Sequence, residues 1–201
     1  MSSSDQEVFQ ILEQRTKALA IALGFRDPST LEHSTRVQTL AAELGKAVGL
    51  NVKQLAALRI SAKFHDIGKI GIPDHILMKP TKLDHQDWTV MVRHPEIGEQ
   101  IVRSTELEGA AETGQIIRHH HEHYDGQGYP DRIAGEAIPI GARIISIVDS
   151  YDAMAFTRPY HRGRSHADII TQIQRESGAK HDPYLLKHFC RIINTSKHRV
   201  A

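Results

Sequence analysis

Residues 63–73 read Lys-Phe-His-Asp-Ile-Gly-Lys-Ile-Gly-Ile-Pro and set titratable groups among apolar neighbours. His65 and Asp66 are adjacent, and Lys69 follows one helical turn after Asp66. Burying a carboxylate beside an imidazole is unfavourable unless a proton, a counter-charge or a metal ion compensates. The stretch therefore predicts a polar site inside the core, and its partners must come from elsewhere in the chain.

Composition limits the classes of protein to which the chain can belong. The 201 residues are 40% hydrophobic and 24% charged, which predicts one globular domain. The net charge of +1 argues against a large nucleic-acid-binding surface. Cys190 is the only cysteine, so no internal disulfide forms. The polar first residues and the lack of a long apolar run agree with that reduced cysteine, and we expect a cytoplasmic protein.

Apolar residues recur at helical spacing through most of the chain, and no stretch alternates as a strand would. Asn51 and Asp84 are candidate N-caps, and the helix after Asp84 is expected to continue through His94 with a kink at Pro95. A long loop rich in glycine and proline begins at Asp125. We predict an all-α fold with helices over 8–23, 28–48, 52–65, 85–101, 110–121, 140–156 and 166–173.

Side chains that commonly bind metals fall on the apolar faces of five of these helices. They are His33, His65 with Asp66, His94, His120 with His121, and Asp149. A single inward histidine is more often an ordinary core residue than a ligand. Many inward imidazoles would each need a hydrogen-bond partner, whereas one shared cluster of cations satisfies all of them. Imidazole and carboxylate without cysteine indicate zinc, manganese or iron.

Seven protein ligands are more than one ion usually takes, so the set predicts two ions bridged by Asp66. Two ions a few ångströms apart hold the attacking and leaving oxygens of a phosphoryl transfer and generate hydroxide near neutral pH. The predicted chemistry is hydrolysis of a phosphate ester. Lys69 and Arg158 are equally well explained as phosphate contacts or as solvated surface residues.

The ordered motifs resemble those of the HD-GYP subgroup of the HD metal-dependent phosphohydrolase superfamily. The resemblance covers about residues 27–183 and includes the His-Asp-Ile-Gly-Lys run at 65–69 and the Gly-Tyr-Pro run at 128–130. It implies an HD-type helical domain at 27–201, preceded at 1–26 by a helix that is a candidate linker or dimerisation segment. Ordinary core packing explains that helix equally well.

The resemblance also implies an activity, a cofactor and a set of site residues. The activity is hydrolysis of cyclic di-GMP, or of cyclic GMP-AMP, to a linear dinucleotide such as pGpG and often on to GMP. The cofactor is a di-iron or di-manganese centre. One metal would take His33, His65, Asp66 and Asp149, and the other would take Asp66, His94, His120 and His121. Lys69, with Asp66, would be catalytic, and Lys69 and Arg158 would contact phosphate. Tyr129 would border the pocket, in a loop that in this family also docks partner proteins such as cyclase domains.

Some features of the chain depart from the family pattern or leave alternatives open. Ser29 stands where some members have a glutamate that helps to bind a third metal, so we expect a two-metal site. We expect His119 and His123 to be exposed. A catalytically weak receptor that binds cyclic dinucleotides and signals to a partner remains an alternative. Hydrolysis of nucleotides or of guanosine tetraphosphate by another HD branch is disfavoured by the Gly-Tyr-Pro loop.

Overall fold

The computed structural model describes residues 3–26, 28–156 and 163–200, with side chains from residue 10 onward except at 28 and 29. The described residues form helices and no strand, apart from one isolated bridge between Ser177 and His181. The predicted all-α fold is confirmed. Within those ranges, no helix is both long enough and apolar enough to cross a membrane. The longer helices are α1 (Ser3–Arg26), α2 (Pro28–Ala47), α3 (Val52–Phe64), α6 (His94–Arg103), α7 (Ala110–Arg118), α8 (Ile140–Ala155), α9 (His166–Arg175) and α10 (Pro183–Ile193).

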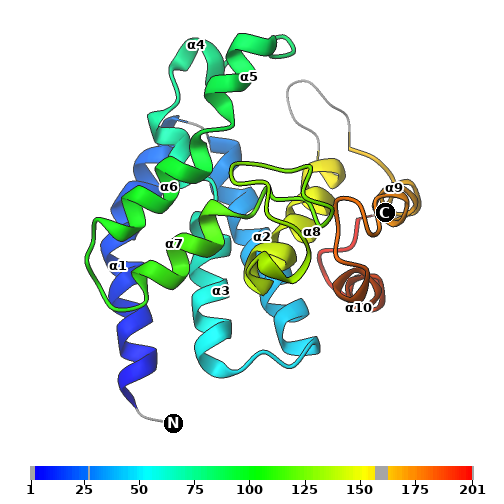
Figure 1. The fold of residues 1–201 in the computed structure, drawn as a ribbon, viewed down its shortest axis with the longest axis horizontal. Helices are drawn as coiled ribbons and strands as arrows, with labels where there is room; N and C mark the ends of the chain where they lie inside the picture. The colour runs from blue at the N-terminus through cyan, green and yellow to red at the C-terminus, as the bar shows by residue number, and fades with distance from the viewer. Residues whose placement is uncertain (1–2, 27, 157–162, 201) are drawn as a thin grey trace.

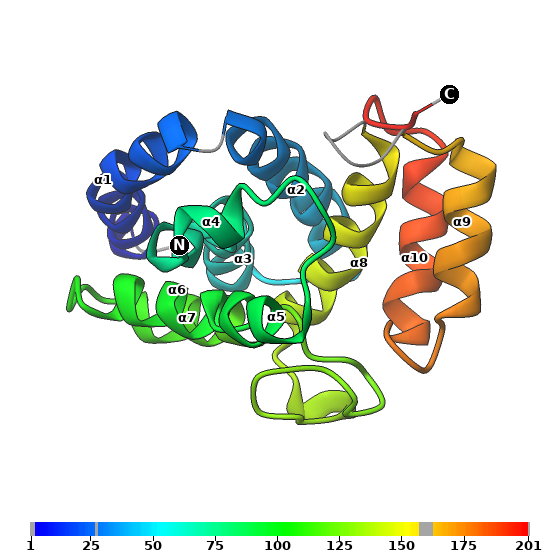
Figure 2. The ribbon, with the colours of Figure 1, turned by 90° about the horizontal axis from the view of Figure 1, so that it is seen from above.

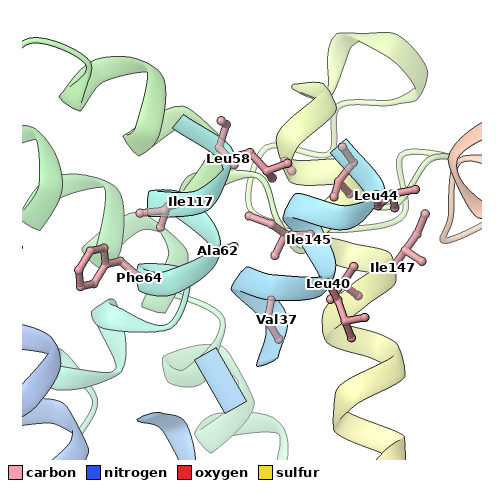
Figure 3. Close-up of a cluster of buried hydrophobic side chains, with 14 of the residues drawn as sticks. Val37, Leu40, Leu44, Leu58, Ala62, Phe64, Ile117, Ile145 and Ile147 are labelled. Carbon is pink, nitrogen blue, oxygen red and sulfur yellow. The ribbon is translucent and has the colours of Figure 1, made fainter. Parts of the chain in front are cut away.

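The centre of the molecule is α2, which packs against α3 on one side and α8 on the other (Figure 1). Leu40 and Leu44 of α2, Leu58 of α3 and Ile145 of α8 are fully or almost fully buried and point toward one another (Figure 3). Burial of such side chains contributes about 1.5–3 kcal/mol each. Figure 2 shows α1 on one flank of this core and α9 with α10 on the other. The core therefore fixes the relative positions of the three helices from which much of the predicted site is built.

The predicted helix starts are more accurate than the predicted ends. Asn51 and Asp84 both cap their helices through complete capping boxes, as expected. The expectation of one continuous helix after Asp84 is wrong. It divides into α5 (His85–Met91) and α6, and Pro95 lies in the first turn of α6, where its missing N–H leaves no bond unmade. Helix α10 follows an Asp182-Pro183 start signal that was overlooked.

Two short elements connect α3 to α5: the 3₁₀ helix η1 (Ile67–Gly71) and α4 (Asp74–Leu77). Arg26, the last residue of α1, fixes this segment. Its guanidinium donates hydrogen bonds to the carbonyls of Lys69 (3.1 Å), Ile70 (2.6 Å) and Ile72, and it pairs with Asp74. Helix α1 also packs into the core through Leu12 and Leu23. A domain boundary at residue 26, and dimerisation through α1, stay predictions.

The loop between α7 and α8 contains the 3₁₀ turn η2 (Gly135–Ala137) and is bound to the body of the protein at several points. Glu122 Oε1 accepts hydrogen bonds from the backbone N–H groups of Asp131 (2.6 Å) and Arg132 (2.9 Å). The N–H of Asp125 donates to the carbonyl of Ala179 (2.9 Å). A Cβ at Gly128 would lie 2.2 Å from the backbone nitrogen of His123, so only glycine fits there. These contacts give the Gly-Tyr-Pro run a defined position.

Candidate metal centre

The predicted ligands meet where α2, α3, α6, α7 and α8 converge. His33 lies on α2 and Asp149 on α8, whereas His65 and Asp66 follow α3 directly. His94 begins α6, and His120 and His121 follow α7. Ligand-type atoms gather there into two groups whose members lie within 4.8 Å of one another: His33 with His65 and Asp149, and His94 with His120 and His121.

Three of the imidazoles are oriented in the same way, by a carbonyl three residues earlier in the chain. The Nδ1 atoms of His65, His94 and His120 lie 2.8, 2.9 and 2.6 Å from the carbonyl oxygens of residues 62, 91 and 117. A carbonyl can only accept, so each Nδ1 carries the proton and each Nε2 presents a lone pair. The Nε2 atoms of His94 and His120 are buried and have no hydrogen-bond partner among the described residues. A bound cation would satisfy both atoms.

His33 is oriented by a carboxylate instead of a carbonyl. Its Nδ1 donates to Asp152 Oδ2 at 2.6 Å, and its Nε2 lies 3.1 Å from Asp149 Oδ1 and 3.3 Å from His65 Nε2. Asp152 also accepts two hydrogen bonds from Arg36, at 2.7 and 2.9 Å. Carboxylate–histidine pairs of this kind fix the ring and raise the basicity of a metal ligand.

Asp152 is a site residue whose function sequence analysis did not recognise. It shares the inward face of α8 with Asp149, three residues earlier, and that spacing was the available signal. Asp152 is almost completely buried, so it needs the two cationic or donating partners that it finds on α2.

Asp66 lies between the two groups of ligands. Its Oδ1 is 3.5 Å from His94 Nε2, and its Oδ2 is 3.5 Å from His65 Nε2. The Oδ2 atom also accepts a hydrogen bond from Lys69 Nζ at 2.7 Å. Each carboxylate oxygen therefore faces a different group, as a carboxylate that bridges two ions does.

Most of these residues have the charge state that metal binding requires. Burial opposes ionisation of Asp66, but Lys69 and the surrounding histidines hold the pKa of its carboxyl well below the usual value. Burial lowers the pKa of His94 to about 4 and that of His120 to about 3, so both rings are neutral near pH 7. Burial also disfavours protonated His33, but its hydrogen bonds to Asp149 and Asp152 raise its pKa to about 9. Neutral imidazoles and ionised carboxylates are the states that bind metals, whereas His33 is protonated near pH 7, so a metal ion there would displace that proton.

The donor set fits a pair of divalent transition-metal ions. Imidazole nitrogens and carboxylate oxygens in these proportions suit zinc, iron or manganese and differ from the all-oxygen sites of calcium. Such ions would bind the Nε2 atoms of His94 and His120, which lack a partner among the described residues, and the carboxylate of Asp66. The groups can therefore hold metal ions, although the geometry does not identify the metal.

The remaining predicted site residues are distributed around this centre. Tyr129 stacks on His121, with ring centroids 4.9 Å apart and an interplanar angle of 29°. Lys69 and Asp149 keep 19% and 20% of their side chains exposed, so they lie where the centre reaches solvent. Arg158 and the side chain of Ser29 lie outside the described residues.

The expectation that His119 is exposed is wrong. The residue is only 6% exposed, and its Nε2 lies 2.9 Å from Asp131 Oδ2. The cause is the end of α7 at Arg118, three residues before the predicted end, which turns His119 toward the loop. Arg118 pairs with the same carboxylate at 2.7 Å, so both residues hold Asp131 in place. His123 is partly buried.

Comparison with known proteins agrees with this geometry. A family model described as HD domain matches residues 17–185. The chain belongs to the HD domain family. A cyclic di-GMP phosphodiesterase response regulator, RpfG of Xanthomonas campestris, is 34% identical over 90% of this chain and 48% of its own length. A 3'3'-cGAMP-specific phosphodiesterase 2 from Vibrio cholerae is 34% identical over 84% of this chain and 32% of its own length.

The fold is similar to that of a solved structure. The crystal structure of a cyclic GMP-AMP specific phosphodiesterase from V. cholerae superposes with a TM-score of 0.68, at 18% identity, over 94% of this chain and 49% of that one. The HD chain thus spans half or less of the relatives named here. The predicted resemblance to the HD superfamily is confirmed.

Proposed function

We propose that this HD protein is a metal-dependent phosphodiesterase that hydrolyses cyclic di-GMP to linear pGpG. The observation that carries the proposal is the position of Asp66, with one oxygen toward each group of histidines. The names of the relatives support the substrate class, because they include cyclic di-GMP and cyclic GMP-AMP phosphodiesterases. Cyclic GMP-AMP is therefore the alternative substrate.

The cofactor in this proposal is a pair of iron or manganese ions. One ion would be held by His33, His65, Asp66 and Asp149, and the other by Asp66, His94, His120 and His121. When bound, two such ions supply Lewis acidity and an activated water for an in-line displacement at phosphorus. Asp66 would keep them at a fixed separation, since its two oxygens diverge toward the two groups.

The protein residues position the substrate and balance its charge. Lys69 and Asp149 mark the solvent-facing side of the centre, so the phosphodiester would approach there. The Lys69 ammonium would then stabilise negative charge that develops on the phosphate oxygens, a preorganised contribution to catalysis. Arg158 is proposed as a second phosphate contact, and Tyr129 as one wall of the pocket.

Further proposals concern the setting of this activity. A cytoplasmic location suits an enzyme that ends a second-messenger signal. Docking of a cyclase domain or another regulatory protein on the Gly-Tyr-Pro loop, and a homodimer formed through α1, are also proposed.

The direct test is to load the purified protein anaerobically with iron or manganese and to separate the products formed from cyclic di-GMP. We expect a linear dinucleotide as the product. Its formation should stop when a chelator is added and resume when metal is restored. Faster turnover of cyclic GMP-AMP would establish the alternative substrate. Tight binding of both dinucleotides without product would favour the receptor function and contradict the proposal.

Asp152→Asn should weaken metal binding while leaving the fold intact. The asparagine is similar in size, but it cannot pair as a carboxylate with both His33 and Arg36. Loss of such a supporting carboxylate typically reduces metal affinity about 10–100-fold. Titration with Mn²⁺, alongside thermal unfolding of the metal-free protein, measures the two effects separately. Glu32→Gln is the matched control, because it removes the charge of an exposed carboxylate beside His33. Unchanged Mn²⁺ affinity in Asp152→Asn would mean that packing alone orients His33.

A further inference from the structure

Trp88 is the only tryptophan of the chain, and it lies on α5 with 49% of its surface exposed. Its ring meets Tyr129 edge to face, with centroids 6.1 Å apart and an interplanar angle of 81°. Tyr129 in turn stacks on His121. A continuous row of rings thus leads from the candidate metal centre to an exposed indole.

The core does not explain this indole. Trp88 is absent from the hydrophobic core cluster of the described residues and from the partly buried side chains packed against it. Its ring contact is with Tyr129 of the Gly-Tyr-Pro loop. A large aromatic face left open beside a polar site is suited to binding another ring.

Helix α5 also holds Trp88 in a fixed position relative to the centre. The capping box between Asp84 and Asp87 starts the helix, and Lys79 bridges both carboxylates. At the other end, the carbonyl of Met91 accepts the hydrogen bond that orients His94. The helix that carries Trp88 therefore also orients His94, a predicted metal ligand. A residue that binds one part of a substrate while another part lies at the metal centre needs such a fixed position.

We propose that Trp88 stacks on a guanine base of the cyclic dinucleotide while the phosphodiester lies at the metal centre. This assignment rests on the proposed function and adds a specificity residue to it. The row of rings from His121 through Tyr129 to Trp88 leads away from the metal centre, so a base on Trp88 would be separated from the phosphate by its ribose. Stacking on an aromatic side chain reads the flat face of a base and needs no defined hydrogen bond.

Intrinsic fluorescence tests the contact without any turnover, because all tryptophan emission comes from Trp88. Manganese-loaded protein is titrated with GMP and, separately, with ribose 5-phosphate, which has the same phosphate and sugar but no base. We expect saturable quenching by GMP and no comparable change with ribose 5-phosphate. Equal responses to the two compounds, or none to GMP, would overturn the assignment.

Kinetics then separate a binding role from a merely structural one. Trp88→Leu should raise the KM for cyclic di-GMP about tenfold, given the usual worth of base–aromatic stacking, with a much smaller change in kcat. Trp88→Phe should recover most of the affinity, because it restores a flat ring. Thr89 is the exposed neighbour of Trp88 on α5, so Thr89→Ala controls for disturbance of the helix. A fall in kcat with KM unchanged, or no rescue by phenylalanine, would overturn the assignment and mean that Trp88 only supports Tyr129.

The two proposals fail in different ways. If the protein hydrolyses no cyclic dinucleotide, the proposed function is wrong, and quenching by GMP still decides whether Trp88 binds a base. If hydrolysis is normal and Trp88→Leu changes neither KM nor the GMP titration, the stacking assignment alone is wrong.

Discussion

Asp66→Ala should abolish hydrolysis of cyclic di-GMP and remove at least one of the two metal ions. The substitution deletes both carboxylate oxygens that face the two groups of histidines, and it leaves Lys69 Nζ without its partner. Metal Lewis acidity contributes several kcal/mol to such reactions, so kcat/KM should fall by about 10³-fold or more. Product analysis and elemental analysis of the same preparation measure both effects.

Glu32→Ala is the matched control for this experiment, because it removes an exposed carboxylate adjacent to His33. It should retain wild-type activity and metal content. Full activity of Asp66→Ala in a preparation that has lost its metal would contradict the mechanism. Full metal content with full activity would show that Asp66 is no ligand at all.

Gly68→Ala should destabilise the protein and disrupt the metal centre together. A Cβ at residue 68 would lie 1.9 Å from the carbonyl oxygen of His94 and 2.6 Å from the backbone nitrogen of Gly98. These atoms belong to the backbone of α6 and cannot rotate away, so η1 and α6 must separate. We expect a loss of about 3 kcal/mol in the free energy of unfolding, at the upper end of the usual overpacking range. Chemical denaturation and Mn²⁺ titration measure the two consequences.

Gly71→Ala tests the same 3₁₀ helix with a milder contact. Its Cβ would meet only the side chain of Ile97, at 3.1 Å from Cδ1, and that side chain can move. It should lower stability far less than Gly68→Ala and preserve metal binding. Equal stability of the two variants would mean that η1 and α6 are not held as closely as the structure indicates.

Local patterns were sufficient to predict much of the fold and of the candidate site. Helical phase pointed His33, His65 and His94 inward, and the structure buries all three imidazoles. Capping signals gave the starts of α3 and α5, because a cap is a contact between residues only three positions apart.

The parts that were missed depend on residues distant in the chain. His119 is buried because Asp131, on the returning loop, draws it inward together with Arg118. Asp152 becomes a supporting carboxylate only where α2 brings His33 and Arg36 against α8. Nothing in the sequence around Trp88 indicates its neighbour Tyr129, which comes from a loop 41 residues later. Local spacing can show that Asp152 faces inward, but it does not identify partners of this kind.

The central claim is that one chain holds two metal ions joined by Asp66. Its most direct test is the metal content of the protein, reconstituted anaerobically with iron or manganese, desalted and measured against protein concentration. We expect two ions per chain in the wild type. A single ion per chain at saturation, with hydrolysis of cyclic di-GMP intact, would contradict the account.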